Sequence, residues 1–78
     1  MSGIFGAYSK SGKSVLEEVY LGLYALQHRG QECAGIAWSE GGRIEAAKGM
    51  GLLHNAIEQK CLTEKSAPCA IGHVRYTP

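Results

Sequence analysis

The densest group of polar side chains lies in residues 26–36, where the chain reads Gln-His-Arg-Gly-Gln-Glu from Gln27 to Glu32. Part of this polar connector has a purely structural explanation. Gly30 suits the position just past a helix, and His28 and Arg29 place positive charge in a last helical turn, where it complements the helix dipole. A helix cap does not need two amides and a carboxylate around one arginine, so we interpret the polar connector as a candidate site.

Two further candidate site residues lie near the ends of the sequence. In the final segment, alternation places His73 and Arg75 on one side of a strand and Val74 and Tyr76 on the other. The plain alternative for Arg75 is a surface charge on an edge strand. At the other end, a strand that begins almost at the terminus would hold Ser2 at a structured edge.

The cysteines Cys33, Cys61 and Cys69 form an odd set without paired spacing, which favours a reducing cytoplasm and no disulfide framework. Cys69 and His73 are close enough in sequence to raise a zinc site as an alternative, but the C-x-x-C spacing typical of such sites is missing. The sequence therefore predicts no metal and no other cofactor.

The run from Ser11 to Ser14, Ser-Gly-Lys-Ser, resembles the end of a phosphate-binding P-loop between a strand and a helix. That motif requires glycine at the position of Ala7, and Gly6 is one residue out of register. The chain is also short for a doubly wound nucleotide-binding domain. A nucleotide binder is kept only as a third alternative.

The elements that position these residues follow from hydrophobic periodicity. Ser14 and Glu17 match a capping box, and apolar residues at helical spacing predict a helix from Val15 onward. Its wide apolar face is expected to lie against a sheet, and its tyrosines are interpreted as packing residues. We expect strands at residues 3–9, 33–39, 43–48 and 69–76, a hairpin turn at 40–42, a strand break at 49–51 and a short helix within 52–62. The predicted fold class is α+β, with a helix packed on antiparallel strands.

Composition excludes several functions. The 78 residues form one small domain or part of a larger one, and 8 basic against 7 acidic residues give a net charge of +1. This balance does not favour a nucleic-acid partner. No apolar run approaches the roughly 20 residues that span a bilayer, and no signal peptide precedes the first strand, so we expect a cytoplasmic protein without a membrane partner.

Three segments in the same order, residues 1–6 (Met-Ser-Gly-Ile-Phe-Gly), the polar connector and residues 72–76 (Gly-His-Val-Arg-Tyr), resemble the amino-terminal part of the glutaminase domain of amidophosphoribosyltransferases. Residues 48–52 resemble the segment that follows the hairpin in that family. The resemblance covers nearly all of residues 1–78. The run from Gln27 to Glu32 distinguishes this family from glucosamine-6-phosphate and asparagine synthetases.

The resemblance implies an N-terminal-nucleophile (Ntn) hydrolase with an αββα sandwich and glutamine as substrate. In such class II amidotransferases a first-residue cysteine attacks the glutamine amide, and its α-amine, which titrates at about pH 7.7–8.0, acts as general base. Ammonia then passes to a phosphoribosyltransferase domain of purine biosynthesis. By resemblance, Arg75 grips the glutamine α-carboxylate, Arg29 and Gly30 lie beside the nucleophile, and Tyr76 and Thr77 lie near the substrate.

The sequence departs from the family at the nucleophile, where Ser2 replaces cysteine, and Met1 carries the terminal amine. The family's oxyanion-binding Asn-Gly pair, its aspartate for the substrate amine and its phosphoribosyltransferase domain are not among the 78 residues. One oxyanion donor is typically worth about 10²–10³ in rate. We therefore expect these residues to be inactive alone and to pair with a complementary downstream segment or to form a homo-oligomer. The alternative is a non-catalytic module that binds itself or a partner through uncovered strands.

Overall fold

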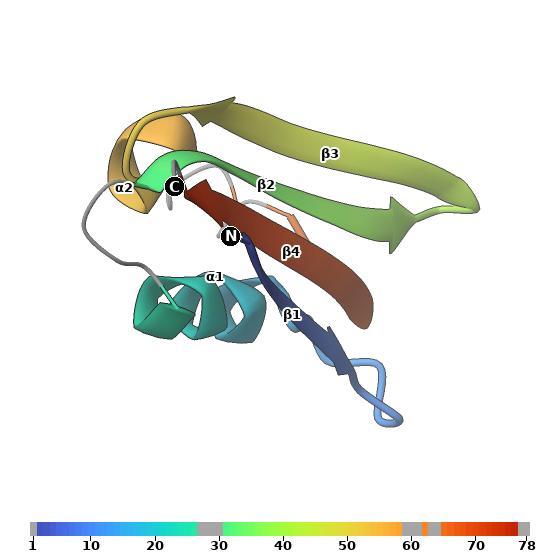
Figure 1. Cartoon of the computed structure of the whole chain (residues 1–78). Coiled ribbons are helices and arrows are strands. Elements are labelled where there is room, and N and C mark those ends of the chain that lie inside the picture. The colour runs from blue at the N-terminus through green and yellow to red at the C-terminus, as the bar shows by residue number, and fades with distance from the viewer. Residues whose placement is uncertain (1, 27–30, 59–61, 63–64, 77–78) are drawn as a thin grey trace.

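The structure, a computed structural model, describes residues 2–26, 31–58, 62 and 65–76. Its elements are β1 (Ser2–Tyr8), α1 (Leu16–Leu26), β2 (Gln31–Glu40), β3 (Arg43–Met50), α2 (Leu53–Ala56) and β4 (Cys69–Tyr76). The strands form a 4-stranded antiparallel sheet in the order β1-β4-β2-β3 (Figure 1). The strand that comes last in the sequence therefore lies inside the sheet, between β1 and the β2–β3 hairpin.

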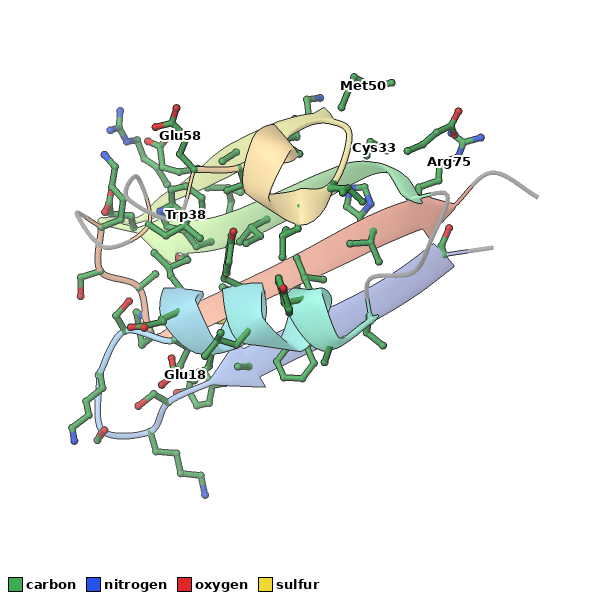
Figure 2. The ribbon with its side chains drawn as sticks, turned by 90° about the vertical axis from the view of Figure 1, so that its left-hand side faces the viewer. Glu18, Cys33, Trp38, Met50, Glu58 and Arg75 are labelled. Carbon is green, nitrogen blue, oxygen red and sulfur yellow. The ribbon has the colours of Figure 1, made fainter. Side chains whose placement is uncertain are left out.

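Both helices lie on the same face of the sheet (Figure 2). The amphipathic pattern of α1 buries one side of the helix against β1 and β4, as expected for a helix laid on a sheet. α2 packs beside β2 and β3, where Leu53 and the following Ile57 are buried. The largest fully buried side chains are Leu16, Val19, Leu23, Ile36, Leu53 and Val74. Of the two tyrosines in α1, Tyr20 is buried and Tyr24 is exposed. Burial raises the pKa of Tyr20, and the neighbouring Tyr24 adds to the shift.

Neither of the described helices lies on the opposite face of the sheet (Figure 2). We call it the open face. Its large apolar side chains are between 60% and 76% exposed: Ile4, Tyr8, Ile44, Met50 and Ile71. They share this face because side chains alternate along each strand and the strands are in register. The α+β class with a helix packed on antiparallel strands is confirmed, with one layer of helices and one sheet among the described residues.

The β2–β3 hairpin turns at Gly41 and Gly42, whose φ angles of 57° and 79° suit the tight two-residue turn that matches the twist of paired strands. The hairpin was predicted, but β3 runs further than expected. The strand break predicted from Gly49 is wrong for Gly49 and Met50, which still pair with β2. The strand ends at Gly51, which has a φ of 94°.

The expected start of α1 is wrong in detail. α1 begins at Leu16, and the Ser14 hydroxyl accepts a hydrogen bond at 3.1 Å from the Ala67 N–H instead of capping the helix. A long-range partner has replaced the local capping box. The short helix expected within residues 52–62 is α2, which ends at Ala56 before the extended backbone of Ile57.

Candidate functional site

The nucleophile position predicted at Ser2 and the predicted carboxylate-binding Arg75 lie next to each other. Ser2 is the first residue of the edge strand β1, and its Cα partner across the ladder is Arg75 of β4. Both side chains lie on the open face, and both residues are exposed. Directly opposed side chains in an antiparallel pair have Cβ atoms about 4.5–5.5 Å apart. The fold therefore brings the two ends of the sequence into one site.

Two more side chains extend this row across the whole sheet. Arg75 pairs on its other side with Cys33 of β2, and Cys33 pairs with Met50 of β3. Figure 2 shows Cys33, Met50 and Arg75 gathered at the same end of the molecule. The Gly51 N–H donates a 2.6 Å hydrogen bond to the Glu32 carbonyl, which ties the end of β3 to the start of β2. The sequence did not pair Cys33 with Arg75, because the two residues are far apart along the chain.

The next row along the sheet contains two more basic residues. His73 lies between Ile4 of β1 and Gly35 of β2, and Gly35 pairs in turn with Lys48 of β3. The prediction that His73 and Arg75 share one side of the last strand is confirmed, with Val74 fully buried on the other side. Arg75 is therefore more than an isolated charge on an edge, since β4 is an inner strand flanked by β1 and β2.

The remaining predicted site residues can be placed only in part. Arg29, Gly30 and Thr77 lie outside the described residues. The backbone of Tyr76 ends β4 and is the Cα partner of Gln31, the first residue of β2. The polar connector therefore leads into the strand that borders Arg75. The start of β1, the end of β4 and the start of β2 meet at one end of the sheet, and each comes from one of the three segments that the sequence singled out.

The ion pair that the described residues contain joins Arg43 Nη2 to Glu45 Oε1 at 3.3 Å, at the hairpin turn and at the far end of β3 from Met50. Cys69 is a free thiol. Within the described ranges, no three His, Cys, Asp or Glu side chains gather as a metal site would require. Neither α1 nor α2, the helices described here, is long and apolar enough to cross a membrane.

Comparison with known proteins gives a consistent result. The chain is 47% identical over 77 residues to the amidophosphoribosyltransferase of Methanocaldococcus jannaschii and 45% identical over 75 residues to that of Synechococcus elongatus. These matches cover 99% and 96% of this chain but only 16% and 15% of the two relatives. The chain therefore spans about a sixth of the length of the curated relatives that it matches. No family model matches it.

Solved structures agree with the sequence comparison. The chain superposes with a TM-score of 0.80 on glutamine phosphoribosylpyrophosphate amidotransferase from B. subtilis, solved with ADP and GMP, at 38% identity over 99% of this chain and 16% of that one. An allosteric regulatory enzyme of purine biosynthesis gives the same TM-score at 37% identity. The fold matches the N-terminal glutaminase domain of these amidotransferases, which is an Ntn-hydrolase fold.

Proposed function

We propose that residues 1–78 form the amino-terminal part of a glutamine-hydrolysing module of the amidophosphoribosyltransferase type. Such a module would release ammonia from glutamine for phosphoribosylamine formation in purine biosynthesis. The observation that carries the proposal is the pairing of Ser2 with Arg75 at one end of the open face. The similarity of nearly the whole chain to amidophosphoribosyltransferases supports it.

In this proposal Arg75 binds the α-carboxylate of glutamine. A planar guanidinium offers two parallel N–H donors to a carboxylate, which fixes both the position and the orientation of the substrate. Ser2 lies on the neighbouring strand and on the same face. A glutamine whose α-carboxylate is bound by Arg75 can therefore place its side-chain amide next to Ser2. Arg29, Gly30, Tyr76 and Thr77 keep the roles that the resemblance gives them as part of the proposal.

The serine at the nucleophile position is expected to lower the rate of glutamine hydrolysis. A hydroxyl is a weaker nucleophile than a thiol and depends more on an adjacent base. We therefore propose that these 78 residues by themselves release no useful amount of glutamate from glutamine. The purified chain is incubated with glutamine, and its intact mass is checked in the same sample. If the parent chain released glutamate and the Ser2→Ala variant did not, this part of the proposal would be wrong.

The proposed function itself is tested in a chimera in which this chain replaces the matching segment of the M. jannaschii enzyme. We expect Ser2→Cys to raise glutamate release well above the Ser2 parent. Ser39→Cys is the matched control, because it adds a thiol to an exposed position of β2 at the other end of the sheet. A Ser2→Cys chimera no more active than the Ser39→Cys chimera would refute the proposed function.

A second candidate function is a non-catalytic module that associates with itself or with a partner. The exposed apolar side chains of the open face favour it, because contiguous apolar surface of this kind marks interaction sites. Light scattering on the purified chain separates the two forms of this candidate. A stable monomer at high protein concentration would exclude self-association and leave partner binding.

A further inference from the structure

The row of His73 shows how the neighbouring strands decide where a side chain of β4 lies on the open face. Its partner on β1 is Ile4, which has a large side chain, and its partner on β2 is Gly35, which has none. A Cβ atom built on Gly35 would lie 2.8 Å from Nε2 and 3.2 Å from Cδ2 of the imidazole. The imidazole therefore lies across β2, in the space that a side chain at position 35 would occupy.

The row of Arg75, two residues further along β4, is built differently. Its partner on β2 is Cys33, and beyond it Met50 of β3 continues the row. Its partner on β1 is Ser2, and β1 is an edge strand of the described sheet. Directly opposed side chains have Cβ atoms about 4.5–5.5 Å apart, so the Cys33 side chain fills the space over β2 that the imidazole uses in the row of His73. We therefore expect Arg75 to lie toward β1.

The position of Cys33 is fixed by its surroundings. Its backbone pairs with β3 on one side and with Arg75 of β4 on the other. The hydrogen bond from the Gly51 N–H to the Glu32 carbonyl anchors the residue before it. The register against β4 shifts just before Cys33, which is the first residue of β2 in the regular pairing. Cys33 is half-buried and Arg75 is exposed, so the short, held side chain limits the space open to the long one.

This limit bears on the proposed reaction, because the reaction depends on the separation between the Arg75 guanidinium and Ser2. Adjacent strands lie about 4.8 Å apart, so a guanidinium that lay across β2 would hold the substrate α-carboxylate several ångströms further from Ser2. A misplacement of about 1 Å can cost on the order of 10²-fold in rate. The direction in which Arg75 lies therefore decides which length of substrate side chain brings an amide to Ser2.

We propose that Cys33 is a positioning residue that keeps the Arg75 guanidinium off β2 and toward Ser2, and so sets the side-chain length of the amino-acid amide that is hydrolysed. The inference rests on the proposed function, because Arg75 and Ser2 keep the roles given there. The role of Cys33 is steric and uses no thiol chemistry. Serine, which has a similar size, should replace it, whereas glycine should open in this row the gap that Gly35 leaves in the row of His73.

The test measures selectivity for substrate length in the Ser2→Cys chimera with the M. jannaschii enzyme. The kcat/KM for glutamine is divided by the kcat/KM for its homologue with one more methylene. We expect Cys33→Gly to lower this ratio at least about tenfold, the lower end of what one methylene is worth in a pocket. Cys33→Ser should leave the ratio unchanged. So should Cys69→Gly, the matched control at an exposed residue at the other end of β4. A change that only destabilised the fold would lower both rates alike and leave the ratio as it was.

Two kinetic results would overturn the inference: an unchanged ratio in Cys33→Gly, or a ratio that falls as far in Cys33→Ser as in Cys33→Gly. Crystal structures of the chimera with and without Cys33→Gly test it without any activity. The Arg75 guanidinium should lie toward β1 in the parent and across β2 in the variant, and a parent guanidinium across β2 would also overturn the inference. The proposed function fails separately. A Ser2→Cys chimera that hydrolyses neither amide, but whose guanidinium moves as expected, would sink the glutaminase proposal and leave Cys33 as the residue that positions Arg75.

Discussion

Gly49 is a position where an added side chain would meet backbone atoms of another element. A Cβ atom at this position would lie 2.5 Å from the carbonyl oxygen of Ala56, and 3.0 Å and 3.1 Å from its Cα and C atoms. All three are backbone atoms at the end of α2, so no side-chain rotation can relieve the contact. Gly49→Ala must therefore push α2 away from β3, and the buried Leu53 and Ile57 move with it.

The magnitude follows from two opposing effects. Overpacking of this kind typically costs about 1–3 kcal/mol, and a backbone obstacle places Gly49→Ala toward the upper end. Replacing glycine by alanine also reduces the conformational entropy of the unfolded chain, which raises the free energy of unfolding by about 0.4–1 kcal/mol. We expect a net loss of about 2 kcal/mol in the free energy of unfolding. At about 4–8 °C per kcal/mol for a domain of this size, the midpoint should fall by about 8–16 °C.

Thermal and urea unfolding of the chain, followed by circular dichroism, measure this loss. Gly6→Ala is the matched control, because its Cβ would meet only the exposed Ile71 Cγ2 at 3.3 Å and the Ala70 carbonyl oxygen at 3.6 Å. It should be neutral or slightly stabilising. If Gly49→Ala unfolded at the same temperature as Gly6→Ala, the packing of α2 against β3 described here would be wrong.

Three further predictions concern binding, pH and a buried donor. In the Ser2→Cys chimera, Arg75→Met should raise the KM for glutamine far more than it lowers kcat, and an unchanged KM would remove Arg75 from the site. Because burial raises the pKa of Tyr20, the stability from its neutral phenol is present below the unfolded value of about 10 and is lost as pH rises through the higher folded value. Tyr20→Phe should therefore lose less stability above pH 10 than Tyr8→Phe, and urea titrations over pH 8–11 measure the difference. The buried Trp38 Nε1 lacks a hydrogen-bond partner. Trp38→Phe should therefore lower the free energy of unfolding by less than the roughly 3–5 kcal/mol of a large-to-small core change. A larger loss of stability would show that the indole N–H has a partner.

The sequence predicted the elements with strong periodicity. Both bounds of β4 agree with the structure, because a clean alternation leaves little ambiguity. The apolar stripe also predicted a helix in the region of α1, whereas the predicted last turn at His28 and Arg29 lies outside the described residues. The errors lie where distant residues decide the local structure. Gly49 resembles a strand breaker, but it is a strand residue that stays small because α2 lies against it. Ser14 resembles a helix cap, but its hydroxyl accepts a hydrogen bond from the N–H of Ala67, which is distant in the sequence.

The site could be predicted only in pieces. Ser2 and Arg75 were both identified, by resemblance, but their contact depends on the register of β1 against β4. Alternation gives the face of a residue and says nothing about which strand lies beside it. For the same reason only the structure showed that Cys33 is the neighbour of Arg75, and that Lys48 and His73 both lie beside Gly35.

The place of β4 between β1 and β2 also fixes the order in which the molecule can be assembled during synthesis. α1 and the β2–β3 hairpin contain mainly local contacts and can form while the nascent chain is still growing. β1 has to wait for β4, which leaves the ribosome last of all the described elements. At about 5–20 residues per second, the amino-terminal strand spends several seconds without its ladder partner. The ladder that joins Ser2 to Arg75 can therefore form only after the strand that carries Arg75 has been synthesised.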